Sequence, residues 1–223
     1  YYHNNIYGTL CLLEKMKQHG VKRMIFSSSA TVYGKPESLP IREDFPLSVT
    51  NPYGRTKLMI EEILRDLWAS DQSWSVALLR YFNPVGAHES GLLCEDPKGI
   101  PNNIVPRILD VAFGKTEFIT VYGDDYQTKD GTGVRDYIHV VDLAYGHVRA
   151  LDYVMGHSSV EAVNLGTGRG YSVFELIHTF ETVNGVHIPY KICARRAGDI
   201  DACYADPAKA KALFGWNAVR GLE

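Results

Sequence analysis

The sequence lacks the marks of several common classes of protein. Its 223 residues include only four cysteines, with no Cys-x-x-Cys pair. This indicates neither a zinc site nor a disulfide framework, and a reducing, cytoplasmic compartment is expected. Lys and Arg number 23 against 26 Asp and Glu, so no basic surface for nucleic acid or an anionic membrane is indicated. No apolar run approaches the length of a membrane span.

The apolar pattern of the first third predicts alternating helices and strands. The expected elements are a helix that stops at Gly20, a strand over 22–27, a helix over 53–69 and a strand over 76–80. The last strand is almost continuously apolar, which is typical of a strand covered on both faces. This order indicates right-handed β-α-β units and a doubly wound parallel α/β sheet.

After about residue 83, Gly, Pro and Asn become frequent and the expected elements are shorter. They are a helix over 103–113, a strand over 119–122, a helix over 141–153, a strand over 162–165 and a helix opened by the capping box of Ser172 and Glu175. We therefore expect a sheet lobe over 1–83 and a smaller, loop-rich α/β lobe over 84–223. Segments of about 136–168 are expected to return to the sheet. The crevice between the lobes is the expected site.

Tyr53 and Lys57 form the first chemical motif. Four residues apart on a helix, they lie on the same face. A phenol has a pKa near 10, and a fixed positive charge nearby favours the phenolate. Such a tyrosine can take a proton from an alcohol. A surface Tyr-Lys pair at helical spacing is the alternative interpretation.

The second motif is a run of three serines, Ser27 to Ser29, at the end of the predicted strand. Open parallel sheets bind ligands at the carboxyl ends of their strands, so these hydroxyls are candidates for a site. A polar passage from strand to loop is the alternative.

Ser29 followed by Tyr53-x-x-x-Lys57 resembles the extended branch of the short-chain dehydrogenase/reductase superfamily, which has a Rossmann-like fold. Four motifs in the same order are more narrowly similar to the UDP-glucose 4-epimerase family. They are Ser-Ser-Ser-Ala-Thr-Val-Tyr-Gly (27–34), Asn-Pro-Tyr-Gly (51–54), Arg-Tyr-Phe-Asn-Pro-Val-Gly-Ala-His (80–88) and Asp-Gly-Thr-Gly-Val-Arg-Asp-Tyr-Ile-His (130–139).

One family feature has no match in this sequence. The family begins with a strand and a Gly-rich turn that holds the dinucleotide pyrophosphate at a helix N-terminus. The stretch Gly166-Thr167-Gly168-Arg169-Gly170 imitates this turn with the wrong spacing, and we interpret it as an ordinary loop. We therefore expect a chain truncated at both ends, with a sheet incomplete at its N-terminus and 1–83 as the C-terminal part of the dinucleotide-binding domain.

The resemblance implies NAD as cofactor and a UDP-sugar as substrate. Ser29 would hydrogen-bond the reacting hydroxyl, Tyr53 would remove its proton, and Lys57 would lower the tyrosine pKa and hold the cofactor's ribose. The sugar would pass through a 4-keto form by a hydride transfer run in both directions. The implied cofactor-binding residues are Asn5, Ser27, Tyr53, Lys57, Tyr81 and Phe82.

The family pattern also implies the residues that hold the nucleotide-sugar. They are Ser29, Asn83, Asn103, Ile104, Thr120, Tyr122, Arg135, Arg196, Asp199 and Cys203. Two arginines match the charge and shape of a diphosphate. The alternatives are a structural ion pair of Arg135 with Asp136 or a neighbour, and an exposed, solvated Arg196.

Cys203 stands where the family limits the space beside the C2 group of the sugar. Its small side chain predicts activity on UDP-N-acetylglucosamine as well as UDP-glucose. The alternative is a buried cysteine with no bearing on specificity. Family members are often homodimers, through a pair of helices that would include the Tyr53 helix.

Two rival functions remain. A nucleotide-sugar dehydratase or decarboxylase needs an added acid or base after the serine-strand threonine, but Thr31 is followed by Val32 and Tyr33. A non-catalytic interaction module is the second, and for this chain alone inactivity is a real alternative. His88, His139 and His147 lack metal-ligand spacing, so no metal is expected and structural hydrogen bonding is the interpretation.

Overall fold

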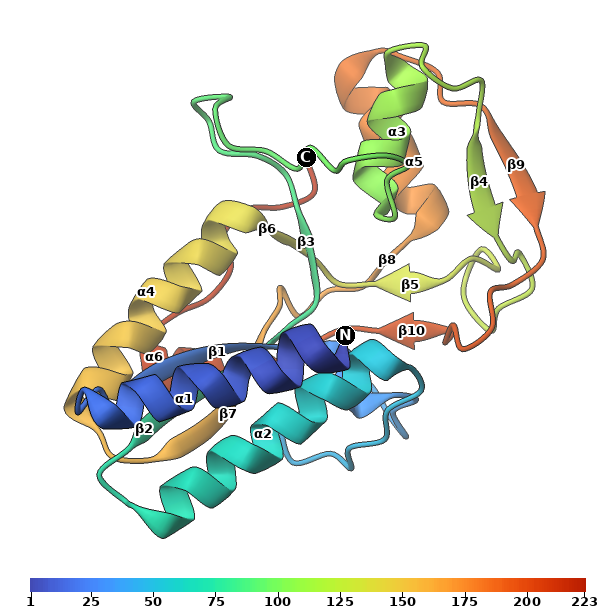
Figure 1. Ribbon diagram of the computed structural model, residues 1–223. Coiled ribbons are helices and arrows are strands. Elements are labelled where there is room, and N and C mark those ends of the chain that lie inside the picture. The colour runs from blue at the N-terminus through green and yellow to red at the C-terminus, as the bar shows by residue number, and fades with distance from the viewer.

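Two lobes make up residues 1–223 in the computed structural model of the chain (Figure 1). The centre of the larger lobe is a three-stranded parallel sheet with the order β1-β2-β7. Its strands are β1 (Arg23–Ser29), β2 (Ser75–Tyr81) and β7 (Val160–Leu165). The predicted α/β class with a parallel sheet is confirmed.

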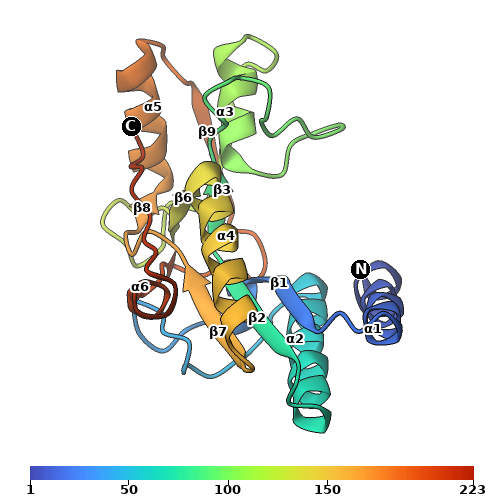
Figure 2. The ribbon, with the colours of Figure 1, turned by 90° about the vertical axis from the view of Figure 1, so that its left-hand side faces the viewer.

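Helices cover both faces of this sheet (Figure 2). One face carries α1 (Gly8–Gln18), which continues a π-helical turn (Tyr2–Tyr7), and α2 (Pro52–Ser70). The other carries α4 (Val140–Gly156) and α6 (Ala208–Phe214). Alternate residues of β2 divide between the faces, since Leu78 packs with Leu64 of α2 and Leu79 packs with Leu143 of α4. The apolar run predicted for this strand is therefore buried on both sides.

The smaller lobe stands beyond the carboxyl ends of these strands (Figure 1). It contains α3 (Ile104–Ala112), β4 (Ile119–Tyr122), α5 (Val173–Asn184) and β9 (Tyr190–Cys193). β4 and β9 are parallel, and Ile108, Val121 and Ile177 are buried in the core of this lobe. The capping box predicted at Ser172 and Glu175 is present.

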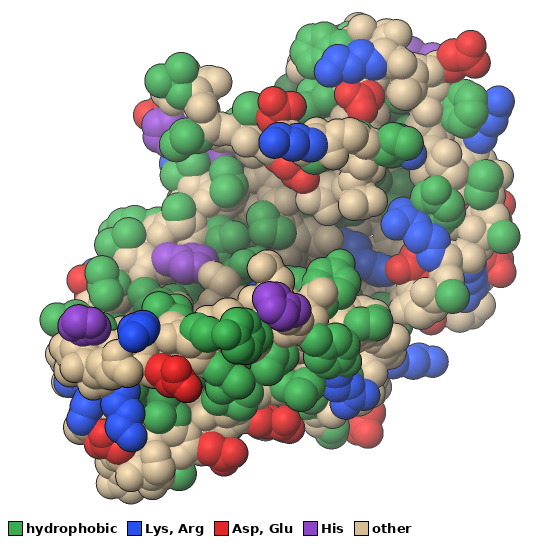
Figure 3. Space-filling view, viewed as in Figure 1, with side chains coloured by type: hydrophobic (Ala, Val, Ile, Leu, Met, Phe, Trp, Pro, Cys, Tyr) green, Lys and Arg blue, Asp and Glu red, His purple; other side chains and the backbone are tan.

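Short strands connect the two lobes. They are β3 (Asn83–Val85), β5 (Val134–Arg135), β6 (Tyr137–His139), β8 (Tyr171–Ser172) and β10 (Ala202–Cys203). β3 pairs with β6, and β10-β5-β8 form a small sheet. These pairings bring distant parts of the sequence to the hollow between the lobes (Figure 3).

After α3 and β4 in the smaller lobe, the chain returns to the larger lobe. α4 packs against the sheet and β7 forms its third strand, in the region where a return was predicted, and α6 packs on the same face as α4. The division of the chain at residue 83 stays a prediction. None of the helices combines the length and the apolar character that crossing a membrane requires.

Candidate active site

The first turn of α2 fixes the position of Tyr53. Asn51 caps this helix, because its side-chain Oδ1 accepts a hydrogen bond from the Gly54 N–H at 2.8 Å. Pro52 occupies the first helical position, where its missing N–H costs nothing. The cap and the proline together place Tyr53 at the end of α2 that faces the hollow.

Ser29 ends β1 beside this helix. Its backbone is extended, and the chain then enters a 3₁₀ turn (Ala30–Tyr33). The Ser29 Oγ accepts hydrogen bonds from Thr31 Oγ1 at 3.0 Å and from Thr31 N at 3.3 Å. Sequence reasoning missed this role of Thr31, although a threonine two residues after a serine is a known local hydrogen-bonding pattern. Thr31 holds the Ser29 hydroxyl in one orientation.

Lys57 lies one turn further along α2. Its Nζ donates to the Ser27 carbonyl at 2.7 Å and lies 5.5 Å from the centre of the Tyr53 ring. Burial lowers the pKa of Lys57. Burial also raises the pKa of Tyr53, and the neighbouring Ser29 hydroxyl opposes this rise only in part. The pKa of Tyr53 is thus raised and not lowered, and the lowering by Lys57 that the family implies stays a prediction.

A cavity of about 390 Å³ opens in front of Ser29 and Tyr53. Nine predicted site residues line it: Ser29, Tyr53, Tyr81, Phe82, Asn83, Asn103, Arg135, Asp199 and Cys203. Asp199 is the only carboxylate among the lining residues, and it lies 4.0 Å from Arg135. No free acid is therefore placed beside the tyrosine.

A second cavity, of about 500 Å³, adjoins the first. Asn83, Asn103, Arg135 and Asp199 line both, so the two form one continuous cleft. The second cavity contains the remaining predicted substrate residues: Ile104, Thr120, Tyr122 and Arg196. Val121, Gly133 and Tyr137, which belong to segments that the sequence analysis noted, also line it, as do residues that the sequence did not single out: Ile100, Pro101, Asn102, Arg107, Ile119, Tyr126 and Val173.

Three arginines line this cleft, and two of them, Arg135 and Arg196, were predicted to bind the substrate. Arg135 of β5 donates from Nη1 to the carbonyls of Val134 and Ile200, which fixes its stem. Arg196 stacks its guanidinium over the ring of Tyr122 at 4.0 Å from the ring centre and remains exposed. Neither is paired with Asp136, and the alternative of a structural ion pair for Arg135 is met in part by Asp199, whose carboxylate lies 4.0 Å away. The pair can hold a diphosphate.

The carboxylate of Asp136 is instead held by the glycine stretch at 166–170. The N–H groups of Thr167, Gly168 and Ala205 all donate to it, at 2.9 to 3.1 Å. Gly168 has a positive φ of 79°, which lets successive N–H groups converge on one anion. The loop is filled by the protein's own carboxylate, and the interpretation of this stretch as an ordinary loop is confirmed.

Of the predicted cofactor residues, Tyr81 and Phe82 line the cavity with Tyr53, and the other three make contacts nearby within the chain. Asn5 Nδ2 donates to Thr56 Oγ1 at 2.9 Å, and Ser27 Oγ lies 3.4 Å from His147 Nε2. Only one bond of the Lys57 ammonium is formed within the chain, the bond to Ser27 O. Hydroxyl groups of a ribose would satisfy its other donors. Their roles in binding stay predictions.

The three histidines near the motifs all make structural hydrogen bonds. His139 Nδ1 accepts from the Val141 N–H at the start of α4, and His88 Nδ1 bonds the Ser90 hydroxyl. His147 bonds the Leu143 carbonyl within α4. The interpretation of these side chains as structural is confirmed.

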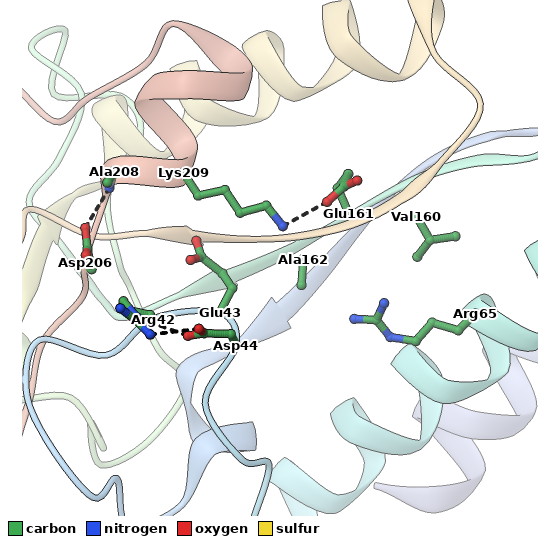
Figure 4. A pocket seen from close by; sticks show the side chains of 10 residues that line it. All are labelled: Arg42, Glu43, Asp44, Arg65, Val160, Glu161, Ala162, Asp206, Ala208 and Lys209. Carbon is green, nitrogen blue, oxygen red and sulfur yellow. Dashed lines mark hydrogen bonds and ion pairs between the residues drawn. The ribbon is translucent and has the colours of Figure 1, made fainter.

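A separate hollow of about 460 Å³ lies where the loop before α2 meets α2, β7 and α6 (Figure 4). Its ten lining side chains carry charges of both signs. Lys209 pairs with Glu161 at 2.8 Å, and Arg42 pairs with Asp44 at 2.8 Å. None of the predicted site residues lines it, so it is distinct from the cleft.

Comparison with known proteins places the chain in a family. The sequence profile of the family described as GDP-mannose 4,6 dehydratase matches residues 1–223. The UDP-glucose 4-epimerase of Bacillus subtilis is 63% identical over 223 residues, and the human UDP-glucose 4-epimerase is 54% identical over 224. The chain is covered completely in both cases and spans 66% and 64% of their lengths, slightly less than two thirds.

Solved structures agree. The UDP-glucose 4-epimerase of Bifidobacterium longum, crystallised with NAD+ and UDP, is 59% identical with a TM-score of 0.96. The UDP-Glc/GlcNAc 4-epimerase of Campylobacter jejuni is 39% identical with a TM-score of 0.82. Both match the whole chain, which covers 66% and 68% of those structures. The chain therefore belongs to the GDP-mannose 4,6 dehydratase family, and within it the chain groups with the UDP-glucose 4-epimerases.

Proposed function

We propose that the protein interconverts UDP-sugars at C4 with NAD as bound cofactor. The observation that carries this proposal is the convergence of Ser29, Tyr53 and Lys57 at one end of a cleft whose other end presents two arginines. A nucleotide held at the arginine end would extend its sugar towards Tyr53. The Bifidobacterium relative, crystallised with NAD+ and UDP, supports the same ligands.

In the reaction, Tyr53 takes the proton of the sugar 4-hydroxyl while Ser29 orients that hydroxyl by a hydrogen bond. Asn83 and the arginines anchor the nucleotide while the 4-keto sugar turns over in the cavity. NAD, when bound, would supply a reversible hydride acceptor for C4, so the net redox change would be zero.

Activation of Tyr53 requires a positive charge beyond what the chain provides. Burial raises the pKa of Tyr53, and Lys57 directs its ammonium to the Ser27 carbonyl. We infer that Tyr53 becomes an efficient base only when the cofactor site is filled. The chain's own residues fit the ribose end of a dinucleotide, since Lys57 is half-buried with donors to spare.

The absence of a free acid in the cavity supports epimerisation over dehydration. Loss of water from the sugar needs an added proton donor beside Tyr53, and the one lining carboxylate, Asp199, faces Arg135. Cys203 supports a broader substrate range, because this small side chain lines the sugar cavity. We propose activity on both the glucose and the N-acetylglucosamine series, as the name of the Campylobacter relative describes for that enzyme.

The cell context follows from the same proposal. We place the protein in galactose metabolism in the cytoplasm, as a homodimer. The exposed apolar side chains of Tyr7 and Leu10 on the first helical segment support a partner surface there. Light scattering of the purified protein tests the dimer.

The decisive test is a Tyr53→Phe variant assayed for conversion of UDP-glucose to UDP-galactose with added NAD. We expect turnover to fall by a factor of about 10² or more, because a general base contributes about 10²–10⁴. UDP affinity, measured by calorimetry, should not change. Tyr153→Phe, a tyrosine of α4 outside the cleft, is the matched control. A protein that binds UDP but converts neither UDP-glucose nor UDP-N-acetylglucosamine would be a binding module instead.

A further inference from the structure

A row of polar side chains crosses the central sheet at full burial. Ser28, Arg80 and Asn164 are register partners on β1, β2 and β7, and each is at most 1% exposed. Two residues earlier, on the same face, the corresponding row contains Phe26 and Leu78 and is apolar. The polar row directly precedes the strand ends that form the site.

The side chain of Glu61, on α2, forms hydrogen bonds with two residues of this row. Its Oε1 accepts from Ser28 Oγ at 2.5 Å and from Arg80 Nε at 2.9 Å, and its Oε2 accepts from Arg80 Nη2 at 2.6 Å. Glu61 is fully buried. The pair is bidentate, a geometry that fixes direction as well as distance.

The third nitrogen of the guanidinium, Nη1, also has partners, one of which is the Glu43 carbonyl at 3.3 Å. Arg80 Nη1 donates to Tyr33 Oη at 3.0 Å, and Tyr33 in turn donates to Asn164 Oδ1 at 2.7 Å. Near the hollow of Figure 4, Arg65 lies 3.8 Å from Glu61 and marks the outer edge of the network. Each nitrogen of the guanidinium and each oxygen of the Glu61 carboxylate thus has a hydrogen-bond partner, which a stable buried pair requires.

Stability alone gives little reason for such a pair. Removing two charges from water is costly, and apolar replacements of buried ion pairs are often neutral or stabilising. What the pair adds is a set of directional hydrogen bonds that fixes the position of α2 relative to β1 and β2. A slide of α2 by one residue, about 1.5 Å along its axis, would break both carboxylate contacts.

These hydrogen bonds fix the part of α2 that contains Tyr53 and Lys57. Tyr53, Lys57 and Glu61 follow one another at intervals of four residues on neighbouring turns. Lys57 contacts the carbonyl of Ser27, and Glu61 contacts the hydroxyl of Ser28, so two neighbouring turns of α2 are tied to the end of β1. Tyr53, one turn before Lys57, lies beside Ser29.

We propose that Glu61 and Arg80 are positioning residues that set the register of α2, and hence the distance of Tyr53 from the reacting hydroxyl beside Ser29. This inference rests on the proposed role of Tyr53 as base. A displacement of about 1 Å at a reacting group can cost about 10²-fold in rate.

The test compares the double variant Glu61→Met/Arg80→Met with Leu64→Ala, a buried apolar change on the same helix. We expect the double variant to keep its urea midpoint and its KM within about twofold, and to lose about 30- to 100-fold in kcat. Leu64→Ala should lower the urea midpoint and leave kcat unchanged. Arg80→Lys keeps the charge without the bidentate geometry, so its kcat should lie between those of the parent and the double variant.

A second readout does not depend on turnover. The pKa of Tyr53 can be followed by NMR of ¹³C-labelled tyrosine, with the resonance assigned by Tyr53→Phe. Loss of register should admit water and move this pKa back towards 10 in the double variant but not in Leu64→Ala. An inactive parent would refute the proposed function, and the NMR titration would then decide the positioning role by itself. A double variant with parent kcat and an unchanged Tyr53 titration would overturn the proposal. Should the double variant fail to fold, the same two readouts on Arg80→Lys decide.

Discussion

The carboxylate of Asp136 should be among the most sensitive polar groups of the fold. It is completely buried and accepts from the N–H groups of Thr167, Gly168 and Ala205, and from the Thr167 hydroxyl at 2.7 Å. Asp136→Ala leaves three N–H groups without a partner, each at about 1–3 kcal/mol when buried. Ala205 is fully buried and the other two are half-buried, so we expect a total loss of about 4 kcal/mol.

Urea unfolding measures this loss, provided that the dependence on denaturant is unchanged. Asp136→Asn keeps one acceptor oxygen and should lose about half as much, roughly 2 kcal/mol. Asp44→Ala, which removes an exposed partner of Arg42, is the matched control and should stay within about 0.5 kcal/mol. A free energy of unfolding for Asp136→Ala within about 1 kcal/mol of the parent would refute the reasoning.

The pH dependence provides an independent check. Burial raises the pKa of Asp136 above its ordinary value of 3.8, although the hydrogen bonds oppose the rise. A raised folded-state pKa means that protonation favours the fold, so this contribution is complete below pH 3.8 and is lost as pH rises through the folded value. The stability difference between the parent and Asp136→Asn should therefore be largest at acid pH.

Three further predictions concern other parts of the molecule. Burial raises the pKa of Cys203 to about 11, so iodoacetamide at pH 8 should leave it unmodified while the exposed Cys193 reacts, as peptide mass spectrometry would show. Hydrogen bonds, first from Lys22, lower the pKa of Asp71 to about 2. The stabilising contribution of Asp71 is therefore present above pH 3.8 and lost as pH falls towards 2. In Lys22→Met this pKa should be higher, which an NMR titration would measure. Gly34→Ala should cost at least about 2 kcal/mol in urea unfolding, because Gly34 has a φ of 61° beneath a backbone carbonyl.

The sequence predicted what depends on local pattern. The shared face of Tyr53 and Lys57 follows from helical spacing alone, and the buried strand at 75–81 follows from its composition. The very short strands β5 and β10, by contrast, contain no periodicity to detect. Their parallel pairing, which places Cys203 beside Arg135, exists only in the folded chain.

The buried polar network of Ser28, Arg80 and Asn164 could not be predicted from local sequence pattern, because it depends on the register of three strands. Ser28, Arg80 and Asn164 are separated by more than 50 residues each, and nothing local indicates that they are partners. A lone arginine in an apolar strand is the one signal that could have been used. It requires a buried acid, and Glu61 was available on a predicted helix.

The opposite orientations of Arg135 and Asp136 explain how the cleft keeps a cation available. Successive side chains of an extended segment point to opposite sides, so Arg135 lines both cavities while its neighbour turns into the core. There the N–H groups of Thr167 and Ala205 hold the carboxylate of Asp136. Had Asp136 faced the cleft, it would have neutralised Arg135 at short range. The only carboxylate near Arg135 is Asp199, at the 4.0 Å limit of an ion pair. The glycine stretch thus binds the carboxylate of Asp136, which would otherwise compete for Arg135 with the diphosphate of the proposed substrate.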